Sequence, residues 1–383
     1  MKIAKLAFGL ICLAILASNI VTMSRWSEAR GVYDDICYLR QAHLFQRLGI
    51  GGLNTNAAFD YDDYAKGKWK EISYAEWQDP TRWPCHNPMP GGKIVIQYPP
   101  GTGFLLALFP EGNQVVPLYI AASLIVCGLA LSGIFLARTL PSIVGAGLFG
   151  ALAIYLMINP AKASYSIAPT MAVCAVAGFL TALWLTRQKR SLLLLALIGL
   201  LLGASVSFRL PNALLLAGYC LFLAVAFLRS RTVADFMQGL GFGVGALVGM
   251  TPTLLAQAVN AGSPLATTYG SVDAVAPAFD LAVLGQYLRD TQSALIVLAI
   301  GSTAWFLRVG EGSVRQVALV VAGNLVVNLV FFLSHPIFTP YYIVPIAMLS
   351  LWSVSFAWLM QPEQARQPAL LAREPASLGV PSR

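Results

Sequence analysis

Two adjacent carboxylates, Asp34 and Asp35, are the residues of this sequence best suited to chemistry, and they follow its first apolar stretch. If residues 32–48 form a helix, Asp34 shares one stripe with Tyr38 and Phe45. Desolvation beside a membrane raises the pKa of a carboxyl group, which favours a general base. Alternatively, the acids only stabilise the helix start through its dipole. The catalytic interpretation is favoured for Asp34. For Asp35, catalysis and stabilisation of the helix start are equally consistent with the sequence.

Arg209, in the segment SVSFRLPN, is the strongest candidate for an anion site. A guanidinium group binds phosphate through paired, charge-assisted hydrogen bonds. The alternative is an arginine that extends to the lipid headgroups. Lys162 offers a second cation at the same level of the membrane. Further candidates for substrate binding on that side are Tyr98, His86, His335 and Tyr342.

Metal and nucleotide chemistry find little support in the sequence. Its three histidines show neither HxxxH nor HExxH spacing, so we expect no zinc site. A divalent cation on Asp34 or Asp35 is left open, and no cofactor is required. The sequence has no GxxxxGK[ST] phosphate loop and no GxSxG elbow, which argues against nucleotide-driven function and the commonest serine hydrolases.

Composition identifies an integral membrane protein. The 383 residues are 57% hydrophobic and 11% charged, against roughly 25% charged in soluble domains. The net charge of +8 comes mostly from loops between apolar stretches. Such loops report orientation, so we expect no nucleic-acid partner.

We predict an all-α polytopic fold with about ten membrane-spanning helices. Residues 1–23 form the first helix, which is apolar enough to span and is expected to stay uncleaved. Residues 24–114 form a long extracytoplasmic loop with amphipathic juxtamembrane helices and the two acids. Residues 115–360 hold nine helices, and residues 361–383 a disordered cytoplasmic tail. The nine are expected near 115–137, 142–158, 167–186, 191–207, 210–228, 236–258, 291–307, 316–333 and 341–360.

The distribution of basic residues predicts the orientation. The short loops on the side of Asp34 contain three basic residues, Lys162, Arg209 and Arg289, and the opposite loops contain many more. By the positive-inside rule both termini are cytoplasmic, in a bacterial inner (plasma) membrane. The long loop then faces the periplasm or the outside. There, Cys37 and Cys85 are as consistent with a disulfide as with two free thiols.

Several segments resemble the GT-C superfamily of membrane glycosyltransferases, including bacterial mannosyl- and arabinosyltransferases. An acidic pair opens YDDICYLRQAHLF after the first apolar stretch, and QYPPGTGFLLALF closes the long loop. NAGSPLATTYG, FRLPN and TPYYIVPIAML are similar to further segments of that superfamily. The resemblance extends over most of residues 1–360.

The resemblance implies transfer of a sugar from a polyprenyl-phosphate donor to an acceptor outside the cytoplasm. It assigns the role of base to Asp34 and phosphate binding to Arg209, less firmly to Lys162. With no globular domain after the last helix, the expected acceptor is a lipid or a glycan. Alternatives are a lipid-linked sugar flippase, a small-solute transporter or a scaffold subunit of an envelope-polysaccharide complex. A transporter would more often carry ionisable groups deep in its helices.

Overall fold

The computed structural model describes residues 1–28, 33–158, 164–187, 190–270, 276–339 and 341–361. Lys162 and nearly all of the predicted tail lie outside these residues. Within them the chain forms fourteen α-helices, four 3₁₀ helices and one two-stranded sheet. The fold is therefore mostly helical, as predicted, with a small hairpin that was not.

Each of the ten predicted ranges overlaps an apolar helix. These are α1 (Lys2–Met23), α5 (Val115–Leu136), α6 (Leu140–Tyr155), α7 (Ile167–Thr186), α8 (Leu192–Val206), α9 (Ala217–Ser230), α10 (Val233–Ala261), α12 (Thr291–Val309), α13 (Gly312–Leu333) and α14 (Val344–Leu359). The 3₁₀ helix η4 (Leu210–Leu216) leads into α9. Seven of the described helices are long and apolar enough to cross a membrane, whereas α6, α8 and α14 are shorter. Ten crossings therefore stay a prediction.

Helices α7 and α14 form the centre of the bundle. They pack against each other, and almost every residue of α14 is buried. Neither helix shows a polar face, because a helix covered on all sides needs none. Helix α1, by contrast, is mostly exposed and leaves its apolar side chains for lipid.

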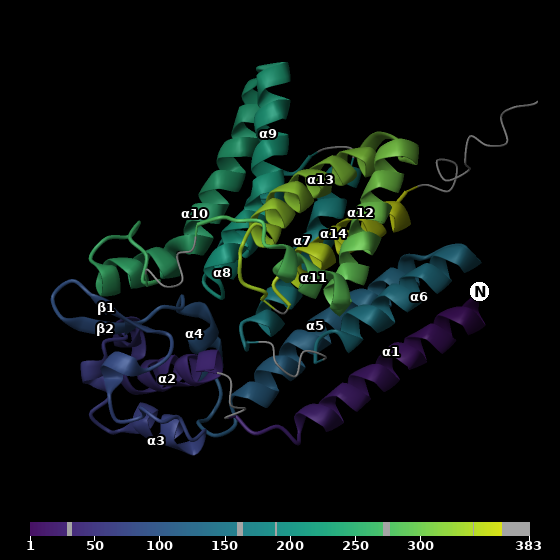
Figure 1. The fold of residues 1–383 in the computed structure, drawn as a ribbon. Helices are drawn as coiled ribbons and strands as arrows, with labels where there is room; N and C mark the ends of the chain where they lie inside the picture. Colours follow the sequence, from purple (N-terminus) through teal and green to yellow (C-terminus); the bar gives the residue numbers. More distant parts are fainter. Residues whose placement is uncertain (29–32, 159–163, 188–189, 271–275, 340, 362–383) are drawn as a thin grey trace, which may run out of the picture.

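The long loop folds into a compact cap at one end of the bundle, beside the end of α10 (Figure 1). Its elements are α2 (Tyr33–Leu48), η1 (Gly49–Leu53), η2 (Ala57–Phe59), α3 (Tyr64–Glu71), η3 (Pro80–Arg82), β1 (His86–Met89), β2 (Lys93–Ile96) and α4 (Gly101–Ala107). Another short helix, α11 (Leu281–Arg289), precedes α12.

Helix α2 is covered by protein rather than lying open at an interface. Its predicted apolar stripe is buried, and it packs on η1 and α4. The antiparallel hairpin pairs His86 with Ile96 and Met89 with Lys93, and Gly91 and Gly92 take positive φ in its turn. Glycine suits these two positions because it has no Cβ atom to clash at positive φ.

The tight packing of α8 on α10 gives a testable prediction. A Cβ atom on Gly203 would collide with the backbone of Ala246, so the two helices would have to separate. Gly203→Ala should lower the free energy of unfolding by about 1–3 kcal/mol, measured by thermal unfolding in detergent. Gly243→Ala on α10 has open space around its Cβ and is the matched control. Equal stability of the two variants would contradict this packing.

Candidate active site

Asp34 lies in the first turn of α2, where its side chain is partly exposed. The Tyr98 hydroxyl, from the segment between β2 and α4, donates a hydrogen bond of 2.6 Å to Asp34 Oδ1. Burial and the neighbouring Asp34 carboxylate raise the pKa of Tyr98 well above its usual value. Tyr98 therefore keeps its proton and acts as a donor to the carboxylate.

Asp35 is placed differently. It is 0% exposed, and its Oδ1 accepts a hydrogen bond of 3.1 Å from the backbone N–H of Tyr165, just before α7. This contact ties the start of α2 to the start of α7. Of the two acids, Asp34 is the one with access to a ligand.

Arg209 lies between α8 and η4 and is only 6% exposed. Its guanidinium carbon lies 3.5 Å from the ring centre of Tyr342, a close cation–π contact. Among the described residues, its side chain has no hydrogen bond and no ion pair. A buried cation without a counter-charge is costly, so this position favours binding of an anion.

Tyrosine rings lie beside both Asp34 and Arg209. Tyr38, one turn after Asp34, stacks on Tyr98 with ring centres 5.0 Å apart, and Tyr269 lies 6.2 Å from Tyr98. Burial raises the pKa of Tyr38; the Asp34 charge raises it further, and the Arg209 charge lowers it. Both charges therefore act on one ring, and the two residues border the same aromatic site.

Sequence reasoning did not assign Tyr38 or Tyr269 to the site. The signal for Tyr38 was its position four residues after Asp34 on the predicted stripe. Tyr269 was present as the last residue of the pattern N-x-G-x-P-x-x-x-x-Y, which starts at Asn260. A lone tyrosine in a loop gives no indication of its partners, so only the fold places it.

An apolar groove of about 760 Å³ borders the site. It lies between α2, α4, α8 and α10, and exposed side chains such as Phe104 and Leu255 line it. The Gly101 N–H donates to Ser207 O at 2.6 Å at the groove, and a Cβ atom on Gly101 would lie 2.7 Å from that oxygen. Glycine is thus required in the YPPG segment, where the chain of Tyr98 meets the chain of Arg209.

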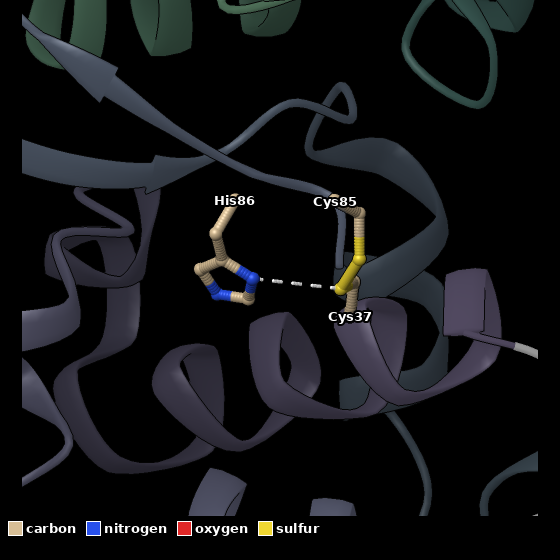
Figure 2. Close-up of side chains that lie close together, drawn as sticks. All are labelled: Cys37, Cys85 and His86. Atoms are coloured by element: carbon tan, nitrogen blue, oxygen red, sulfur yellow. Dashed lines mark hydrogen bonds between the residues drawn. A yellow bond between two sulfur atoms is a disulfide. The ribbon is translucent and has the colours of Figure 1, made fainter. Parts of the chain in front are cut away.

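A buried cluster secures the loop to α2. Cys37 on α2 and Cys85 form a disulfide, and His86 lies beside it (Figure 2). Arg40 is 0% exposed and donates to His86 Nε2 at 3.3 Å. Its Nε lies 3.6 Å from Asp60. The predicted substrate-binding residue His86 is therefore placed in a structural cluster.

This cluster is poorly suited to a metal ion, although Cys37, Cys85 and His86 bring their ligand atoms close together. The two sulfurs are bonded to each other. Because Arg40 can only donate, His86 Nε2 is the acceptor, and Nδ1 carries the proton donated to Pro84 O at 2.9 Å. Neither ring nitrogen has a lone pair left for a metal.

Of the remaining predicted residues, His335 is not brought to Asp34. His335 follows α13 and stacks on Phe331 with ring centres 6.3 Å apart. In the described part of the chain, His335 has no contact with Asp34 or Arg209. Lys162 lies outside the described residues, so its predicted role stays a prediction.

The disulfide predicts a loss of stability on its removal. Replacing Cys37 and Cys85 together by serine should lower the free energy of unfolding by about 2–4 kcal/mol, because a long loop is no longer closed in the unfolded chain. Thermal unfolding with and without reductant measures the effect. Cys220→Ala, which removes an exposed free thiol, is the control. A wild-type melting temperature that reductant leaves unchanged would contradict the disulfide.

His86 predicts a pH dependence of stability. Burial, and then the Arg40 charge, lower the pKa of His86 to about 3. The unfolded chain thus binds the proton at higher pH than the folded one. The contribution of His86 to the free energy of unfolding is therefore fully present above the unfolded pKa of about 6.5. It decreases as the pH falls toward 3, with a loss of about 2 kcal/mol by pH 5.

The measurement compares melting temperatures at pH 8 and pH 5. His86→Gln should remove most of the difference, because glutamine does not titrate, whereas His335→Gln should keep the wild-type difference. A parallel decline in wild type and His86→Gln would show that other groups cause the acid sensitivity.

No family model, curated protein or solved structure matches this chain. Function is therefore inferred from the site itself. The site combines a carboxylate held by a tyrosine, a buried arginine with no counter-charge among the described residues, and an adjoining apolar groove.

Proposed function

We propose that this chain is a membrane glycosyltransferase that moves a sugar from a polyprenyl-phosphate donor to a lipid or glycan acceptor. The single observation that carries the proposal is Arg209, a buried cation stacked on Tyr342 and without an anionic partner in the described part of the chain. A phosphate group supplies the missing charge and matches the planar donor geometry of arginine.

The groove supports a donor with a long apolar tail. Ser207 and Phe208, the two residues before Arg209, line it, so a phosphate on Arg209 would have its hydrocarbon chain directly beside an apolar surface. A water-soluble sugar nucleotide has no long apolar chain that could bind to such a surface. The combination therefore favours a lipid-linked donor over a nucleotide-linked one.

The proposed reaction is a direct displacement. Asp34 takes the proton of an acceptor hydroxyl, and the resulting oxygen attacks the anomeric carbon of the donor sugar. The bond between that carbon and the phosphate oxygen breaks, and the electron pair leaves with the lipid phosphate. Arg209 stabilises the charge that grows on this leaving group. Tyr98 orients Asp34 through its hydrogen bond.

The proposed location is the outer side of a bacterial inner membrane, with both termini in the cytoplasm. Asp34 follows the carboxyl end of α1, and Arg209 follows that of α8. Under the positive-inside orientation both positions face away from the cytoplasm. Donors on that side are lipid-linked, which agrees with the groove.

Transfer of radiolabelled sugar tests the proposal. Full-length protein in nanodiscs would be supplied with undecaprenyl-phosphate-linked mannose, glucose, galactose or arabinose, and with membrane lipids and glycans as acceptors. We expect label in the acceptor fraction. Asp34→Asn and Arg209→Gln should each lower the rate by roughly 30- to 1000-fold, the effect of losing one transition-state charge interaction.

Matched controls lie at the two ends of α11, which the proposal places on the same side of the membrane. Asp280→Asn keeps the helix cap that Asp280 makes to Ala282, and Arg289→Gln changes an exposed arginine. Both should retain wild-type rates. Asp34 and Arg209 variants that transfer sugar as fast as these controls would refute the assigned roles.

A further inference from the structure

A second, much smaller cavity adjoins the site. Its volume is about 10 Å³, room for roughly one water-sized group. Tyr98 and Tyr269 of the site line it, together with amide and hydroxyl side chains, and none of its described lining residues is charged. Its polar lining comprises Gln41, Gln97, Thr253, Gln257, Asn260 and Thr268.

Part of this polar lining serves the fold. Asn260 accepts from the Thr55 N–H at 2.9 Å and donates to Leu53 O at 2.8 Å, which fastens the end of α10 to the cap. The Thr253 hydroxyl is paired with that of Ser207 at 2.9 Å. These groups have their hydrogen bonds and need no ligand.

Gln41 is different. It is 1% exposed, and its buried Oε1 has no hydrogen-bond partner among the described residues. Its amide makes no hydrogen bond to any residue in the described ranges, and neither does that of Gln257, which lines the same cavity from α10. Burying an amide without partners is unfavourable, so a ligand group that donates and accepts would remove the penalty.

The position of Gln41 links it to the proposed chemistry. It lies seven residues after Asp34 on α2, which is two turns along the same face. Gly103 on α4 packs against it, and a Cβ atom there would lie 2.6 Å from Gln41 Cγ. The absence of a side chain at position 103 therefore leaves the space in which the Gln41 amide is held.

We propose that Gln41 and Gln257 bind one hydroxyl group of the transferred sugar. The inference rests on the proposed function. A hydroxyl group fits the cavity, and an amide can both donate to it and accept from it. The rings of Tyr98 and Tyr269 also border the cavity, so the sugar ring would lie beside them.

The test compares donors that differ in one hydroxyl. The sugar that the wild-type protein in nanodiscs transfers best from undecaprenyl phosphate is measured against its monodeoxy analogues, with kcat/KM as the readout. A site built around a hydroxyl should reject one analogue by about 100-fold or more. Gln41→Met, nearly the same size but without the amide, should lose about 10- to 100-fold on the complete sugar and less than about threefold on that analogue.

The control is Gln286→Leu, which replaces an exposed glutamine on α11 and should leave kcat/KM unchanged for every donor. Melting temperatures establish that Gln41→Met is folded. Gln257→Met repeats the comparison for the second amide that lines the cavity. If the Gln41 and Gln257 variants slow all donors equally, the amides hold an ordered water or only pack, and the inference falls while the proposed function stands. If the wild type transfers no donor, the proposed function fails and takes this inference with it.

Discussion

The burial of the Arg40 guanidinium is the constraint on which the cap depends. Desolvation lowers its pKa to about 10, so Arg40 remains charged at neutral pH and has to be paired inside the protein. Its partners are the carbonyls of Thr55 and Asn56, the carboxylate of Asp60 and the ring of His86. All of them belong to the segment that folds back over α2. One side chain thus fixes the loop, and the loop fixes the helix.

With its other side held by Arg40, α2 presents one face to the ligand sites. Asp34, Tyr38, Gln41 and Phe45 follow each other at helical spacing on this face. These four residues belong, in the same order, to the carboxylate, the aromatic site, the small polar cavity and the apolar groove. The order suits a ligand with a polar head and a long apolar tail. A single helix therefore sets the spacing of the proposed subsites.

Hydropathy predicted the ten apolar helices. A chain in lipid has to make its backbone hydrogen bonds within itself, so a long continuous apolar run can be recognised as a helix from a single sequence. The helical period of residues 32–48 likewise predicted α2 and the Asp34–Tyr38 face. It did not predict that Arg40 is buried, because the partners of Arg40 lie in an irregular loop without a period. For the same reason His86 looked like a substrate residue, and its structural role followed only from the contact with Arg40.

The two charged groups of the site are kept from neutralising each other. In the described ranges no ion pair joins Asp34 to Arg209; Asp34 accepts from Tyr98, and Arg209 stacks on Tyr342. A direct pair would hold both charges in one strong contact, and neither would serve a ligand. Neutral tyrosines solve this problem, because a ring stabilises a cation and a hydroxyl stabilises an anion without cancelling either charge. In the proposed reaction this separation lets Asp34 act on the acceptor hydroxyl while Arg209 binds the phosphate. The tyrosines thus keep both charges available to the ligands.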